Sequence, residues 1–78
     1  MLKIKDNVDL KELEKFGFYL EGNTYSYDIG KRKRLAICII DRIILKPNLN
    51  RWNIKNKYLV DRIIFNMAIS GIVEKVEE

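Results

Sequence analysis

Apolar and polar residues alternate along residues 18–39, and two turn signals interrupt this alternation. Gly22-Asn23 suits a two-residue hairpin turn, because the first turn position needs a positive φ that glycine adopts easily. Pairing Glu21 with Thr24 then gathers one apolar set on a single face, because side chains along a strand alternate between faces. That set consists of Phe18, Leu20, Tyr25, Tyr27 and Ile29. The segment therefore predicts an antiparallel hairpin with one buried face.

Four consecutive cations separate this hairpin from the next alternating segment: Lys31, Arg32, Lys33 and Arg34. The apolar residues that belong on the buried face of that segment are Leu35, Ile37 and Ile39. A slip of one residue would turn all of them to solvent, so their burial selects a three-residue loop over residues 30–32. Ile29 then lies opposite Lys33, and Asp28 lies opposite Arg34 on the outer face. The four cations are predicted to form a hairpin tip and the first rungs after it.

Two helices are predicted from their start and stop signals. The first begins after Asp9, a good N-cap residue, and ends before Gly17, which suits the left-handed position that closes a helix. The second begins after Asn53 or Asn56 and ends before Gly71. Both segments carry apolar residues at helical spacing, so each has one face for the core.

Short strands complete the pattern near both ends of the chain. Residues 2–5 alternate, residues 43–45 follow a break at Asp41-Arg42, and residues 72–78 close the chain. The break is favoured because a long strand would bury a lone carboxylate. We expect one α+β domain over residues 1–78, with a small antiparallel sheet of four to five strands and two helices on one face. The expected order is β-α-β-β-β-(β)-α-β.

Charge is distributed unevenly along the chain. Ten cations face only two acids in residues 31–62, whereas acids outnumber cations in residues 1–30 and 63–78. A basic block of this density favours an acidic partner, either an acidic protein surface or nucleic acid.

Side chains typical of catalysis or metal binding are scarce. The chain has no histidine and a single cysteine, Cys38, so it lacks the pairs used by nucleophilic enzymes and zinc sites. We expect a protein that is not an enzyme, has no cofactor and no metal, does not enter the membrane, and works in a reducing cytoplasm.

The basic block and its neighbouring tryptophan define the first candidate surface. Its residues are Lys31, Arg32, Lys33, Arg34, Arg51, Trp52, Lys55 and Lys57. Cations beside an exposed ring suit single-stranded nucleic acid, which offers phosphates and bases for stacking. The plainer interpretation is a solvated hairpin tip, with Trp52 covering an edge of the core.

The second candidate surface lies on the second helix. At 100° per residue, the side chains expected to pack on the sheet are Leu59, Val60, Ile63, Ile64, Met67 and Ala68. Tyr58, Phe65 and Ile69 gather on the opposite side. This extra apolar stripe indicates a partner helix, a homodimer or cover from the first helix.

Two stretches carry a resemblance to known proteins. "LKIKDNVDLKELEKFGF" (2–18) and "SGIVEKV" (70–76) resemble the ends of short uncharacterised proteins from phages and prophages of low-GC Gram-positive bacteria. The resemblance implies a phage-encoded protein that acts by binding in the host cytoplasm. The expected function is non-enzymatic inhibition or modulation of a host protein, with immune (anti-defence) effectors among the candidate targets. The alternative is a nucleic-acid-binding regulator.

Overall fold

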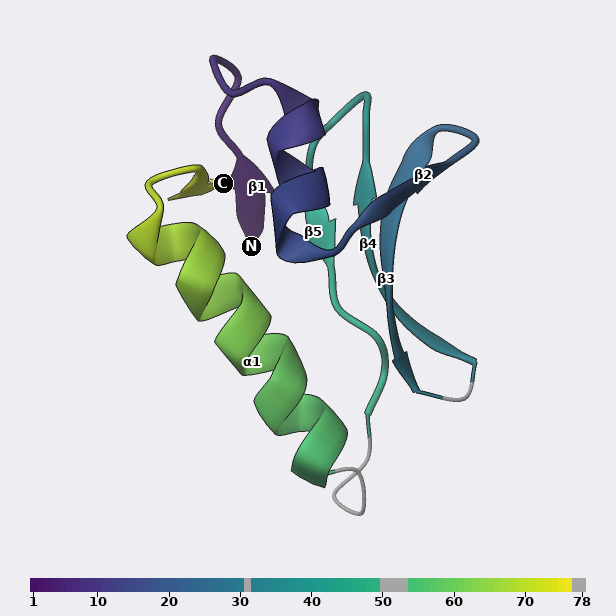
Figure 1. Cartoon of the computed structure of the whole chain (residues 1–78). Helices are drawn as coiled ribbons and strands as arrows, with labels where there is room; N and C mark the ends of the chain where they lie inside the picture. Colours follow the sequence, from purple (N-terminus) through teal and green to yellow (C-terminus); the bar gives the residue numbers. More distant parts are fainter. Residues whose placement is uncertain (31, 50–53, 77–78) are drawn as a thin grey trace.

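The computed structural model describes residues 1–30, 32–49 and 54–76 (Figure 1). Within these ranges the chain forms six strands, one 3-10 helix and one α-helix. In order they are β1 (Leu2–Ile4), η1 (Leu10–Phe16), β2 (Tyr19–Glu21), β3 (Thr24–Gly30), β4 (Lys33–Cys38), β5 (Ile44–Leu45), α1 (Ile54–Ile69) and β6 (Val73–Lys75). The predicted α+β class is confirmed, whereas the predicted strand count and order are matched only in part, because six strands form where four to five were expected. The first of the two predicted helices is a 3-10 helix.

The strands form two antiparallel sheets, where one sheet was predicted. Strands β2-β3-β4-β5 make a four-stranded sheet in sequence order, and β1 pairs with β6. A single bridge between Lys3 and Ile43 joins the two sheets. Pairing along β5 ends at Leu45, close to Pro47, which has no N–H to donate. Strand β1 has its main pairing with β6, at three positions.

The β3–β4 hairpin confirms one part of the predicted register and corrects another. Asp28 pairs with Arg34, as expected. The strands then shift by one residue, so that Gly30, and not Ile29, pairs with Lys33. The expected three-residue loop is wrong, because a bulge at Ile29 absorbs the extra residue. The bulge shortens the connection while Ile29 stays buried.

The core forms where the two helical segments cover the four-stranded sheet from the same side (Figure 1). Its fully buried side chains are Ile4, Leu13, Leu35, Ile37 and Met67. The predicted core face of the second helix is confirmed at Val60, Ile63, Ile64 and Met67, whereas Ala68 is exposed. Leu20 was expected in the core but is 54% exposed, because β2 is the edge strand of the sheet.

Three of the predicted capping residues lie at the ends of the helical segments. Asp9 accepts a hydrogen bond from the Lys11 N–H at 3.0 Å, and Gly17 has a φ of 96°. Gly71, with a φ of 77°, follows the end of α1. The helix begins at Ile54, so Asn56 lies inside it and is not its N-cap. The alternative N-cap, Asn53, lies outside the described residues.

The predicted break at Asp41-Arg42 is a turn that also ties the two sheets together. The Asp41 carboxylate accepts a hydrogen bond from the Ile43 N–H at 2.9 Å, and Arg42 adopts a φ of 61°. The Arg42 carbonyl accepts from the Ile4 N–H at 2.9 Å. Its Nη1 donates at 2.7 Å to the carbonyls of both Lys5 and Val8. One residue thus holds the chain between β1 and η1 against the β4–β5 turn.

We expect Arg42→Ala to lower the free energy of unfolding by about 2–4 kcal/mol, because two half-buried carbonyls lose a charged donor. Arg42→Gly should cost about 1 kcal/mol less, since glycine relieves the left-handed backbone conformation. Urea denaturation of both variants measures the two contributions. An Arg42→Ala variant as stable as the wild type would show that these bonds contribute nothing net.

Candidate functional site

Three segments that are distant in sequence meet at one end of the molecule. A Cβ atom added to Gly30 would lie 2.8 Å from the Asn56 side-chain nitrogen, so the β3–β4 tip touches the first turn of α1. Lys33 Nζ donates to the Asn48 carbonyl at 2.8 Å, which ties the same tip to the segment after β5. Figure 1 shows this end of the molecule, where α1 begins beside the β3–β4 hairpin.

The described cations at this end are called the basic end: Arg32, Lys33, Lys46, Lys55 and Lys57. All except Lys33 are exposed. Lys55 and Lys57 lie in the first turns of α1, and Arg32 lies at the hairpin tip with a φ of 62°. The fold therefore gathers cations from three separate elements. The predicted site residues Lys31, Arg51 and Trp52 lie outside the described residues.

The described members of the four consecutive cations do not form one patch. Arg34 lies on the outer face of the sheet, where its Nη1 is 3.1 Å from a Glu21 carboxylate oxygen and its Nε is 3.2 Å from Asp28. Lys33 is half-buried, and its amine donates a hydrogen bond to the Asn48 carbonyl. Arg34 is thus neutralised by strand neighbours and points away from the basic end, because adjacent strand residues face opposite sides.

Tyr19 extends this outer-face cluster. Its hydroxyl donates to Asp28 at 3.0 Å, and its strand position faces Ser26, which is only 4% exposed. Partial burial raises the pKa of the Tyr19 phenol above its ordinary value of 10.0, and the hydrogen bond to Asp28 raises this pKa further. Both effects favour the neutral phenol, because an ionised ring would lose solvation and repel the carboxylate.

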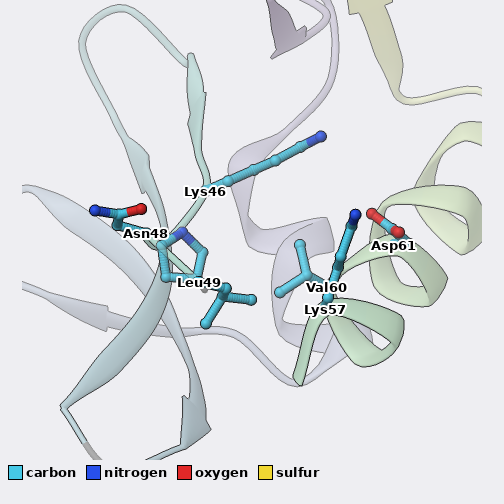
Figure 2. A pocket seen from close by; sticks show the side chains of 7 residues that line it. Lys46, Asn48, Leu49, Lys57, Val60 and Asp61 are labelled. Atoms are coloured by element: carbon cyan, nitrogen blue, oxygen red, sulfur yellow. The ribbon is translucent and has the colours of Figure 1, made fainter. Parts of the chain in front are cut away.

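A groove of about 450 Å³ opens between α1 and the segment that follows β5. Figure 2 shows its lining, with Lys46, Asn48 and Leu49 on one side and side chains of the helix on the other. The full lining is Lys46, Pro47, Asn48, Leu49, Lys57, Val60 and Asp61. The volume falls within the range of small-ligand sites, roughly 300–1,000 Å³.

The lining combines two amines and the Asp61 carboxylate with an apolar surface. Lys46 and Lys57 come from facing elements and supply positive charge, while Pro47, Leu49 and Val60 supply apolar contact. Such a groove fits a carboxylate group that lies beside an apolar side chain. Lys46 was not among the predicted site residues. Its only sequence signal was its place in the basic block, because its partner across the groove is distant in sequence.

The second predicted surface is exposed in the structure. Tyr58 is 69% exposed, Phe65 63% and Ile69 68%. The structure adds Ile54, at 73%, to the same stripe. Cover by the first helix is therefore wrong, because η1 packs elsewhere in the core through Leu13.

Within residues 1–30, 32–49 and 54–76, no group of three or more histidine, cysteine or acidic side chains is placed to hold a metal ion. The thiol of Cys38 is half-buried. Among these residues no helix has the length and apolar character needed to span a membrane.

Comparisons with protein-family models, with curated proteins and with solved structures found no significant match.

The raised pKa of Tyr19 predicts a loss of stability in alkali. The folded state holds the phenolic proton more tightly than the unfolded chain, so this stabilisation is complete below the unfolded pKa near 10 and is lost as pH rises above it. Between pH 9 and pH 11, the wild type should lose more unfolding free energy than Tyr19→Phe. Parallel loss in both proteins, measured by denaturation across this pH interval, would contradict the assignment.

Proposed function

We propose that this protein is a non-enzymatic binding protein whose basic end captures an acidic surface on a protein partner. The resemblance of its terminal segments to phage and prophage proteins makes a host protein the class of partner. Binding there would inhibit or modulate that host protein. The observation that carries the proposal is the groove between Lys46 and Lys57, where cations border an apolar lining.

The composition of the groove favours a protein over nucleic acid. Pro47, Leu49 and Val60 offer contact to an apolar side chain, which a phosphate backbone does not supply. Asp61 lines the same groove and would repel phosphates. A protein segment can place a carboxylate toward the lysines and turn an uncharged group toward Asp61.

The exposed cations set how the partner would be recognised. Exposed ion pairs each contribute about 0.2–1 kcal/mol, so two lysines cannot by themselves provide tight binding. Apolar contact with Leu49 and Val60 must supply much of the affinity. The lysines, together with Arg32 and Lys55, would chiefly speed association with an acidic surface and select against basic surfaces.

Reversing both groove lysines tests the proposal. We expect Lys46→Glu/Lys57→Glu to weaken binding of a fluorescent acidic peptide with interspersed leucines by about tenfold or more, because two favourable pairs become repulsive. Thermal stability should change little, since exposed substitutions usually alter it by about 0.5 kcal/mol or less. Fluorescence anisotropy at low and at physiological salt measures the binding.

Lys11→Glu/Lys75→Glu is the matched control, because it makes the same change in net charge at two exposed lysines outside the groove. It should bind nearly as the wild type does. Equal weakening by the control pair would show that net charge alone is responsible. Tighter binding of a single-stranded oligonucleotide than of the peptide, with a steep salt dependence, would instead support the nucleic-acid regulator.

A further inference from the structure

The exposed face of α1 carries a short heptad pattern. Tyr58 and Phe65 are seven residues apart and so lie on one line along the helix. Ile54 precedes Tyr58 by four residues, and Ile69 follows Phe65 by four. These four residues form the helix stripe, and each is between 63% and 73% exposed. The stripe lies opposite the buried face made by Val60, Ile63, Ile64 and Met67.

Opposite charges flank the middle of the stripe. At 100° per residue, Asp61 lies about 50° to one side of the centre of the stripe, and Arg62 lies about 50° to the other side. Both side chains are exposed. The stripe therefore has an acidic margin and a basic margin at nearly the same height along the helix.

We infer that the helix stripe pairs with that of a second copy of this chain, with the two α1 helices parallel. A two-fold axis parallel to the helices places the acidic margin of one copy against the basic margin of the other. Asp61 then faces the partner's Arg62, and the same pair forms again on the other side of the interface. Tyr58 and Phe65 pack against their own counterparts in the middle.

In the antiparallel alternative, the same side chains face residues of like charge. In an antiparallel pair with the stripes fully overlapped, the two-fold axis is perpendicular to the helices and passes at the height midway between Asp61 and Arg62. The acidic margins of both copies then lie on one side of the interface, and the basic margins lie on the other side. Asp61 would face the partner's Asp61, and Arg62 would face the partner's Arg62. Like charges placed opposite one another are destabilising, so the charge pattern selects the parallel pair.

The dimer should be weak and reversible. Four side chains on one helix bury roughly 300–400 Å² per copy, well below the ~800 Å² per partner of a standard stable interface. The parallel geometry also places two basic ends side by side, and their repulsion limits the affinity at low salt. We expect a dissociation constant on the order of 10–100 μM.

Charge exchange between the two margins tests the pairing. Asp61→Arg and Arg62→Asp should each weaken dimerisation by about tenfold, because the altered pair occurs twice in a symmetric dimer. The double variant Asp61→Arg/Arg62→Asp should return to within about threefold of the wild type, since the exchanged charges again face opposite charges. Sedimentation equilibrium over a range of concentrations measures the dissociation constant. Failure of the double variant to recover would overturn the parallel pairing.

Apolar and cross-linking variants check the surface and its orientation. Phe65→Glu should give a monomer, whereas Leu20→Glu, at an exposed leucine on the edge strand, should leave the dimer intact. In a Cys38→Ser background, Tyr58→Cys alone should form a disulfide-linked dimer under mild oxidation. Cross-linking only in a mixture of Tyr58→Cys with Phe65→Cys would show an antiparallel pair and overturn the inference. So would a wild type that stays monomeric into the millimolar range.

Discussion

The guanidinium of Arg42 is the contact on which the assembly of the two sheets depends. Strand β1 shares only one bridge with the four-stranded sheet, so the β1–β6 pair has few backbone bonds of its own to that sheet. Arg42 adds two hydrogen bonds from its side chain and one through its carbonyl, all to residues 4–8. This connection brings Ile4, which is fully buried, into the same core as Leu35 and Met67. It also uses one cation of the basic block for structure, so that cation is not available to a partner.

The described cations of the basic block likewise divide into those that hold the fold together and those that are free to meet a partner. Arg34 is held by two carboxylates of neighbouring strands, and Lys33 is held by a backbone carbonyl. Of the other described cations, Arg32, Lys46, Lys55 and Lys57 belong to the basic end, and Lys46 and Lys57 line its apolar groove. Arg62 is also exposed but lies farther along α1. Net charge along a sequence therefore overstates the charge offered to a partner, because β-pairing brings acids from the flanking segments against some of the cations. The basic end contains fewer cations than the basic block of the sequence, and its groove also has apolar side chains and one carboxylate.

Local signals predicted much of this fold. Asp9, Gly17 and Gly71 act within a few residues of their own positions, so the sequence specified where the helical segments begin or end. Alternation specified which residues of β3 and β4 face the core. The bulge at Ile29 was not predicted, because two loop lengths leave the same apolar residues buried. Only the backbone pairing distinguishes the two loop lengths. The bonds of Arg42 join residues 34 and 37 positions apart, and the groove partners Lys46 and Lys57 meet only after α1 docks. No local pattern encodes such contacts.

The pairing of β1 with β6 has a consequence for the order in which the chain folds. The β2–β3–β4 hairpins close short loops, so their entropic barrier is low and they can form early. Residues 2–4 and 73–75 can pair only when nearly the whole chain has been brought together. This two-stranded sheet is three residue pairs long, so we expect it to form after the rest of the core. We therefore expect the backbone amides of β1 and β6 to exchange with solvent sooner than those of β3 and β4. The β1–β6 pair would separate by sub-global unfolding while strands β2, β3 and β4 stay folded.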